Sequence, residues 1–207
     1  EDGKYVCQAE LVTENGSRFL FLDKFAIDCK KKEVLVERTV SVLKEGSGDM
    51  GFSTEFGLYL PAKANGWWTD EYEVFVPGIW YRKNKGVVKG AFASDLYQKN
   101  HYFRVTRMAL PYMQMYRSGT GATVSFCHIS PAPNTGVLEK SSGWFVDESL
   151  QYASLGITAG EKTMLKYVYP GSEGEINYID RGESWAKRSH PVRSTVRHAY
   201  EFCIHFG

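Results

Sequence analysis

The sequence lacks the features that mark several large classes of protein. Its apolar runs are far shorter than the ~20 residues that a membrane-spanning helix needs, so we expect no membrane span. Neither sign of charge dominates, because 25 Lys and Arg against 24 Asp and Glu leave a net charge of +1. That balance gives no electrostatic footprint for nucleic acid, and we expect no nucleic-acid partner. A hydrophobic fraction of 43% excludes a disordered chain and predicts a soluble globular protein.

Cysteine is scarce and widely spaced. Cys7, Cys29, Cys127 and Cys203 form no C-x-x-C motif and have no His at the spacing of a zinc site. Two disulfides would allow several connectivities, among which a sequence cannot choose. Four buried thiols that act as small apolar side chains are the favoured alternative. The disulfide state stays open, and we expect no metal and no cofactor.

Long helical patterns are also absent, and alternation of apolar and polar residues takes their place. In residues 34–43 four valines share one face, and residues 52–60 alternate in the same way. A period of two is typical of half-buried antiparallel strands. Residues 112–117 and 123–129 flank a Ser-Gly-Thr-Gly turn and predict a hairpin. Further strands are expected at 18–23, 73–76, 151–157, 162–169, 176–179 and 200–207, and short helical turns only at 91–100 and 182–189.

Ten or more short strands predict an all-β fold, namely a large antiparallel two-sheet β-sandwich with at most short helical turns. We expect residues 1–207 to form a single domain. The chain begins at Glu1 without an initiator Met or a signal sequence, and its last predicted strand runs to Gly207. We therefore expect it to be the N-terminal part of a longer protein.

A candidate ligand site lies just before the strand at 73–76. Trp67 and Trp68 are adjacent, and Asp70 and Glu71 follow closely. Adjacent residues of an extended segment face opposite ways, so at most one of the two tryptophans need be core. The other could stack on a sugar ring while a carboxylate accepts hydrogen bonds from its hydroxyl groups. The alternative is that both rings pack under the loop.

A second group of aromatic and basic residues follows that strand. Trp80 and Tyr81 stand after a Pro-Gly break, and Tyr102, Arg104 and Arg107 come after a long polar segment. Loops of this length are uncommon without a function. Arg can bind a carboxylate in a bidentate manner, as in an acidic sugar, or can simply pair with a nearby acid.

Histidine supplies the one candidate for catalysis. Two histidines with a carboxylate could perform general acid–base chemistry on a sugar ring oxygen. His128 is in phase with apolar residues of its predicted strand, which favours a core position, and His190 precedes a proline in a predicted loop. The spacing unites no pair among His101, His128, His190, His198 and His205.

Three segments resemble a known family. They are V-P-G-I-W-Y-R-K-N at 76–84, H-Y-F-R-V-T-R-M-A-L-P-Y-M-Q-M-Y at 101–116 and S-G-T-G-A-T-V-S-F-C-H at 118–128. Their order resembles the N-terminal supersandwich domain that precedes an (α/α)6 helical barrel in bacterial glycoside hydrolases. The likeness covers residues 72–207 and implies a galactose-mutarotase-like sandwich. It also implies that the catalytic carboxylates belong to the helical domain, so it carries over no catalytic residue.

The resemblance and the loop residues together favour a non-catalytic domain of a carbohydrate-active enzyme. We expect its partners to be an oligo- or polysaccharide, the C-terminal catalytic domain of the same protein, or both. The resemblance further implies a bacterial, secreted protein that is periplasmic or extracellular. Two alternatives stay open: a stand-alone lectin-like carbohydrate-binding module, and an aldose-epimerase-like enzyme that uses His and a carboxylate.

Overall fold

The computed structural model describes residues 3–61, 71–78, 80–82, 101–134, 145–158, 163–172 and 188–207, with the backbone only at 80–82 and 101. Within these ranges the protein is built from strands and one short 3-10 helix, η1 (Val105–Arg107). The predicted strand 176–179, both predicted helical turns apart from 188–189, and Trp67, Trp68 and Asp70 lie outside the described residues. No helix in the described ranges is long and apolar enough to cross a membrane.

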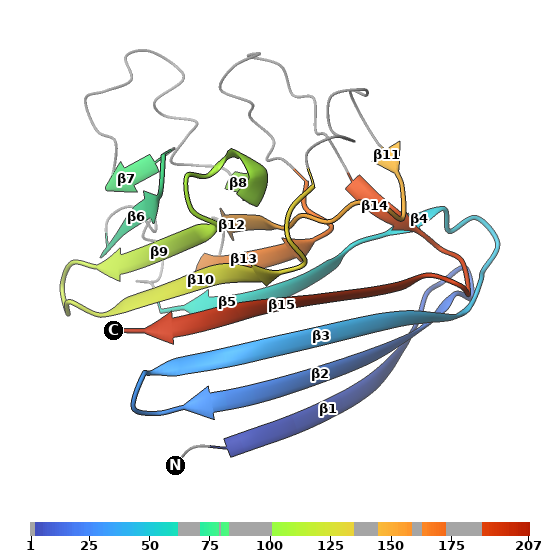
Figure 1. Cartoon of the computed structure of the whole chain (residues 1–207), viewed down its shortest axis with the longest axis horizontal. Helices are drawn as coiled ribbons and strands as arrows, with labels where there is room; N and C mark the ends of the chain where they lie inside the picture. The colour runs from blue at the N-terminus through green and yellow to red at the C-terminus, as the bar shows by residue number, and fades with distance from the viewer. Residues whose placement is uncertain are drawn as a thin grey trace.

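The all-β prediction is confirmed (Figure 1). One sheet has eight strands in the order β1-β2-β3-β15-β10-β9-β6-β7, a second has four in the order β5-β13-β12-β8, and a small third has β11-β14-β4. All described pairings are antiparallel except β11 with β14. The strands are β1 (Gly3–Val12), β2 (Arg18–Asp28), β3 (Glu33–Lys44), β4 (Gly51–Phe52), β5 (Thr54–Leu60), β6 (Tyr72–Val76), β7 (Trp80–Arg82), β8 (His101–Arg104), β9 (Tyr112–Arg117), β10 (Thr123–Ser130), β11 (Phe145–Val146), β12 (Ser154–Thr158), β13 (Thr163–Tyr169), β14 (Arg188–Pro191) and β15 (Arg197–Phe206).

The alternating patterns place their apolar residues on the inner face of the large sheet. Val36 and Val40 of β3 are fully buried, as is Phe202 of β15, and Phe202 lies directly opposite Val36 in the β3–β15 register. The predicted hairpin is present as β9 and β10, with Val124 opposite Met115. The four-residue turn between them leaves the two strands paired without a register shift.

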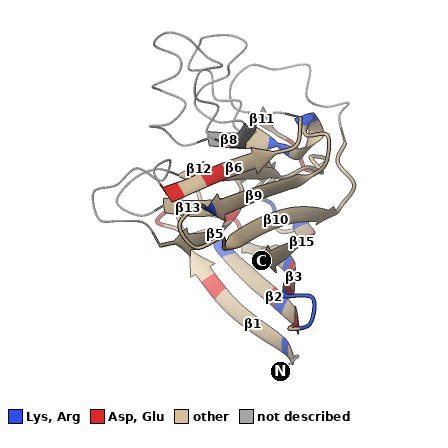
Figure 2. Ribbon diagram, turned by 90° about the vertical axis from the view of Figure 1, so that its left-hand side faces the viewer, with Lys and Arg blue, Asp and Glu red and all other residues tan. Residues whose placement is uncertain are grey.

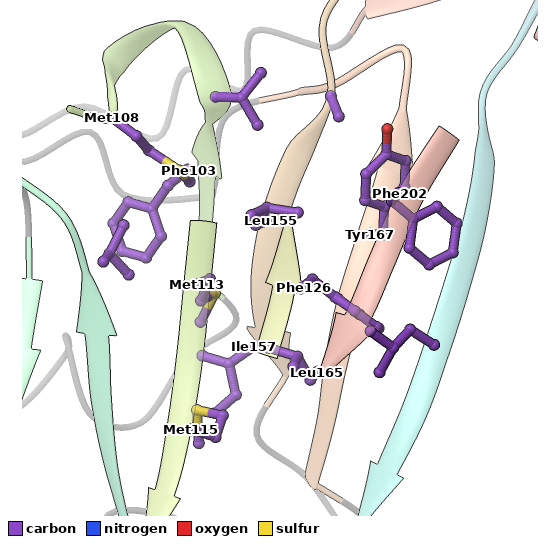
Figure 3. Packing of buried hydrophobic residues seen from close by; sticks show 14 of the residues in the cluster. Phe103, Met108, Met113, Met115, Phe126, Leu155, Ile157, Leu165, Tyr167 and Phe202 are labelled. Carbon is purple, nitrogen blue, oxygen red and sulfur yellow. The ribbon is translucent and has the colours of Figure 1, made fainter. Parts of the chain in front are cut away.

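The main core lies between the eight-stranded and the four-stranded sheet (Figure 3). Its centre is a stack of aromatic rings, because Tyr167 of β13 lies 4.4 Å from Phe202 and 5.2 Å from Tyr200 between ring centroids. Met113, Phe126 and other apolar side chains fill the space around the stack. Aromatic pairs of this kind add stability beyond their buried area.

The sequence did not indicate β1, and the prediction of four buried thiols is wrong in part. β1 is exposed along almost its whole length, so neither of its faces needs the regular apolar alternation that reveals a strand. Cys7 on β1 and Cys29 are both exposed. Cys127 and Cys203 are partly buried and stand opposite each other on β10 and β15, and burial raises the pKa of both thiols. None of the four forms a disulfide.

Gly171 is needed where the chain leaves β13 and passes close to the start of β12. Its amide donates to the Tyr152 carbonyl oxygen at 2.7 Å, and a Cβ at this position would lie 2.4 Å from backbone atoms of Ala153 and Ser154. Backbone atoms cannot move aside as a flexible side chain can. We expect Gly171→Ala to lower the free energy of unfolding by about 2 kcal/mol in urea denaturation. Gly119→Ala is the matched control, because a Cβ there meets nothing within 4 Å, and an equal loss in both variants would contradict this expectation.

Candidate functional site

A pocket of about 250 Å³ opens between the two large sheets, at the end where β5, β9, β10 and β15 meet (left-hand end of Figure 1). The register explains why these ends meet, because Tyr72 of β6 lies opposite Arg117 of β9, and Val124 of β10 lies opposite Phe206 of β15. Apolar side chains dominate the wall. The lining residues are Leu58, Tyr59, Leu60, Pro61, Tyr72, Met115, Arg117, Thr120, Ala122, Thr123, Val124 and Phe206.

One charged pair stands at the rim of this pocket. Arg117 donates to the Glu71 carboxylate at 2.9 Å and lies over the Tyr72 ring, 5.9 Å from its centroid. Ser118 holds the backbone of Glu71 through its amide and its hydroxyl, both at 3.1 Å from the Glu71 carbonyl oxygen. The Tyr72 hydroxyl donates to the Pro61 carbonyl oxygen, and burial raises the pKa of Tyr72 above its usual value. The rim is therefore tied to both ends of segment 62–70.

The pocket suits a small ligand with an apolar face. Its volume is below the ~300–1,000 Å³ of sites for drug-sized ligands, so it would take one ring rather than a long chain. Tyr72 and Phe206, which lie on the core-facing sides of β6 and β15, supply the aromatic part of the lining. The Glu71 carboxylate at the rim is a group of the kind that accepts hydroxyl hydrogen bonds.

The structure separates the predicted site residues into distinct places. Glu71 is at the rim of the pocket, whereas Tyr102 and Arg104 are on β8 at the far edge of the four-stranded sheet. Arg107 is exposed in η1. Trp80 and Tyr81 form part of β7, and their side chains lie outside the described residues. The described residues thus bring only Glu71 of the predicted set to the pocket.

Arg104 belongs instead to a buried cluster with Arg188 of β14 and Tyr152. The two arginines are 7% and 2% exposed. Burial raises the pKa of Tyr152 to about 12, while the two nearby guanidinium groups act in the opposite direction. Arg188 also packs over the Phe145 ring at 5.7 Å. The cluster connects the four-stranded sheet to the small sheet. Because all of its side chains are buried, it presents no open binding surface.

A chain of hydrogen bonds crosses the core through two histidines that the sequence did not pair. His190 Nε2 lies 2.9 Å from the Leu150 carbonyl oxygen, and the Nδ1 atoms of His190 and His198 are 3.0 Å apart. His198 Nε2 is 3.1 Å from Thr54 Oγ1, which in turn is 2.9 Å from the Tyr200 hydroxyl. All four ring nitrogens therefore have partners inside the protein.

The carbonyl at one end of this chain sets the direction of every bond. A carbonyl oxygen only accepts, so His190 Nε2 donates to Leu150, and the neutral ring must then accept at Nδ1. His198 therefore donates from Nδ1 and accepts at Nε2 from the Thr54 hydroxyl at 3.1 Å, a shorter contact than the 3.4 Å between Thr54 Oγ1 and the Tyr169 carbonyl oxygen. Tyr200 then donates to Thr54 Oγ1. Both histidines are neutral in this arrangement, and burial lowers the pKa of each.

His128 is a core histidine, as its position on the predicted strand indicated. It is 3% exposed, and its Nε2 donates to the Pro131 carbonyl oxygen at 2.8 Å. Its Nδ1 accepts from the Tyr167 hydroxyl at 2.6 Å. Burial lowers the pKa of His128 as well. A histidine used in this way supports the aromatic stack and has no free ring nitrogen for a substrate.

Neither an acid–base site nor a metal site is open in the described part of the chain. His190 and His198 are 3% and 2% exposed, and their ring nitrogens are engaged in the core. The described residues contain no group of three or more His, Cys, Asp or Glu side chains that could hold a metal ion. The apolar pocket with its charged rim is accordingly the best candidate for function.

Comparison with known proteins gives only distant structural likenesses. No protein-family model and no curated protein sequence matches this chain. Among solved structures, the Slr1438 protein from Synechocystis sp. PCC 6803 is 12% identical with a TM-score of 0.39, over 99% of this chain and 65% of that one. The alpha-galactosidase from Lactobacillus brevis is 10% identical with a TM-score of 0.43, over 100% of this chain and 26% of that one. The chain thus spans less than two thirds of both proteins, and similarity at this level places it in no family.

Proposed function

We propose that this chain is a non-catalytic β-sandwich domain that binds a saccharide in the pocket between its sheets. The observation that carries the proposal is that aromatic side chains and a carboxylate lie at the opening of the same pocket. Tyr72 and Phe206 line the pocket, and the Glu71–Arg117 pair stands at its rim. A sugar ring needs both kinds of contact, because it has apolar faces and hydroxyl groups around its edge.

The described residues on either side of segment 62–70 support the same proposal. Segment 62–70 contains Trp67, Trp68 and Asp70, and the residues on either side of it, Pro61 and Glu71, are both at the pocket. The chain is therefore anchored to the pocket opening at both ends of this segment. The resemblance to supersandwich domains of glycoside hydrolases points to the same class of ligand, and it implies a catalytic domain elsewhere in the protein.

A glycan-array screen of the purified chain tests the proposal, with isothermal titration calorimetry on any glycan that binds. Ala122 is exposed and lines the pocket, so Ala122→Trp should fill the pocket without disturbing the core. We expect this variant to lose at least ~90% of the binding signal, a change of more than 1.4 kcal/mol in binding free energy. Ile129→Trp is the matched control, because Ile129 is an exposed residue of β10 that does not line the pocket.

The outcomes separate the proposal from its alternatives. Binding that Ala122→Trp abolishes and Ile129→Trp preserves would support a saccharide pocket. Binding that survives Ala122→Trp but is lost in Trp67→Ala or Trp80→Ala would place the site in those loop residues instead. Silence of the intact chain across the array would refute saccharide binding by this chain and leave a role in packing on a catalytic domain.

A further inference from the structure

β1 forms a long exposed edge of the eight-stranded sheet. No described segment pairs with its outer side, and every residue of β1 after Gly3 is exposed. Tyr5, Val6, Leu11 and Val12 are each more than half exposed. β1 projects away from the four-stranded sheet, as Figure 2 shows, and its apolar side chains stay exposed. A run of large apolar side chains on an open edge marks an interaction surface.

This edge lacks several of the features that usually keep an open strand from pairing with another chain. Its ladder with β2 continues over ten residue pairs without a bulge, and β1 contains no proline. Other edge strands in the described structure are shorter, with three residues in β7, four in β8 and seven in β5. Short edges, prolines and bulges are the usual devices that prevent a strand from pairing with another chain. β1 has none of them.

The hydrogen-bond pattern shows which residues of β1 point outward. Thr13 donates its amide to the Ser17 carbonyl oxygen at 2.9 Å, so Thr13 and, by alternation, the odd-numbered residues of β1 direct their amides toward β2. The even-numbered residues therefore offer their N–H and C=O groups to the open side. The same alternation can be followed from β1 through β2 to β3. It requires the amide of Val42 to point away from β2, and this amide does donate to the Val196 carbonyl oxygen.

This alternation restricts how two copies of β1 could pair. In an antiparallel pair, two opposite residues either both point their amides at each other or both point them away. Even-numbered residues must therefore face even-numbered ones. Two registers keep nine of the ten residues paired, one over Gly3–Leu11 and one over residues 4–12. The first places Lys4 opposite Glu10 of the second copy, twice, whereas the second places Lys4 and Glu10 opposite valines.

We propose that this protein forms a two-fold symmetric homodimer in which β1 of one copy pairs antiparallel with β1 of another over Gly3–Leu11, with Cys7 on the axis. The two sheets would join edge to edge into one continuous sheet. Charge favours this register, because it gives Lys4 an opposite charge across the strand pair, where Glu10 binds it in addition to Arg18 of its own chain. A two-fold axis is the usual symmetry of such contacts.

The same register accounts for the apolar side chains of β1. Tyr5 faces Ala9 of the second copy and lies diagonal to Leu11 of that copy, so the exposed ring gains an apolar neighbour. Cys7 faces its own counterpart as a pair without direct hydrogen bonds, for which the Cα atoms are about 4.5 Å apart. That distance lies within the range that a disulfide bridge spans. Cys7 is an exposed free thiol and can therefore report on the register.

Sedimentation velocity over a range of concentrations tests the dimer. We expect a reversible monomer–dimer equilibrium, and we expect Lys4→Glu or Glu10→Lys alone to raise its dissociation constant by roughly tenfold or more. Each single change places like charges opposite each other twice. The double variant carrying both changes restores opposite charges across the axis and should recover the dimer. Equal dimerisation in all four proteins would overturn the proposed contact, as would a monomer at up to roughly 0.5 mM.

Cross-linking tests the register independently. Diamide should couple two Cys7 thiols into a disulfide between chains, with two protons and two electrons passing to one diazene group to give the hydrazine. We expect a covalent dimer on a non-reducing gel that disappears in Cys7→Ser and persists in Cys29→Ser. Val6→Pro removes an outward N–H and should abolish the dimer while leaving the β1–β2 ladder intact. A cross-link that depends on Cys29, or none at all, would overturn the register.

Discussion

Removal of the Asp23 carboxylate, by Asp23→Ala, is expected to lower the free energy of unfolding by about 3–5 kcal/mol in guanidinium denaturation. Arg38 donates to Asp23 twice, from Nε at 2.7 Å and from Nη2 at 2.6 Å. The two side chains are only 11% and 14% exposed. The guanidinium group lies over the rings of Phe21 and Phe56, at 5.7 Å and 5.6 Å. Without its partner, the charge of Arg38 would stay in this apolar setting uncompensated.

The double variant Asp23→Leu with Arg38→Met separates the loss of the pair from the cost of an unpaired charge. Replacing a buried ion pair by apolar residues of similar size is often close to neutral. We expect the double variant to be within about 2 kcal/mol of the parent, since it also loses the bond from Arg38 to the Glu55 carbonyl oxygen. The large difference between the single and double variants is the result that identifies the mechanism.

The neighbouring pair Lys24–Glu37 is a matched control on the same two strands. These residues are 3.2 Å apart and 55% and 44% exposed, on the opposite face of the sheet. An exposed ion pair contributes about 0–1 kcal/mol, so we expect Glu37→Ala to be nearly neutral. If Asp23→Ala cost no more than Glu37→Ala, burial would not determine the strength of the Asp23–Arg38 pair.

Local patterns in the sequence were enough to predict the class of fold. Alternation revealed β3 and β15 because each has one face in the core and one outside, and the Ser-Gly-Thr-Gly turn revealed the β9–β10 hairpin. β1 escaped because it is exposed on both faces. The predicted strand of residues 151–157 begins too soon, because β12 begins only at Ser154. Tyr152 and Ala153 just before it are buried without forming a strand.

Contacts between distant residues could not be predicted in the same way. His190 is on β14, which pairs with β4, and His198 is on β15, which pairs with β3. The spacing of residues along the sequence does not indicate which strands become neighbours, so it could not predict that the two histidines meet. Arg38 and Asp23 meet because the β2–β3 turn fixes their register. Of the candidate site, the sequence indicated Glu71, but the pocket wall comes from five separate strands. Trp67, Trp68 and Asp70 remain predicted ligand contacts.

The buried histidines should make the protein unusually sensitive to mild acid. Desolvation by burial is the main cause that lowers the pKa of His190 and His198 below 6.5, and Arg38 lowers that of His198 further. Asp147 and Glu148 act in the opposite direction on His190. The unfolded chain therefore binds protons more readily than the folded protein. The free energy of unfolding should keep its full value above pH 6.5. It should decline as the pH falls below 6.5, by up to about 1.4 kcal/mol per pH unit for each histidine.

Free energies of unfolding measured in urea between pH 7 and pH 5 would show this decline. The window isolates the histidines, because carboxylates with lowered pKa values, such as Asp49 and Asp147, keep their stabilising effect until the pH falls below about 4. We expect the parent protein to lose about 2–4 kcal/mol between pH 6.5 and pH 5. His128 adds to the loss, since burial lowers its pKa too.

His198→Leu distinguishes the hydrogen-bond chain from a general effect of acid. The variant loses partners for Thr54 and His190 and should be less stable at pH 7 by about 1–3 kcal/mol. Its stability should nevertheless fall less steeply with acid, because one buried proton acceptor is gone. An unaltered slope in His198→Leu would mean that His198 takes up its proton within the folded protein. The bond direction imposed by the Leu150 carbonyl would then hold only at neutral pH, because a protonated His198 cannot accept from Thr54.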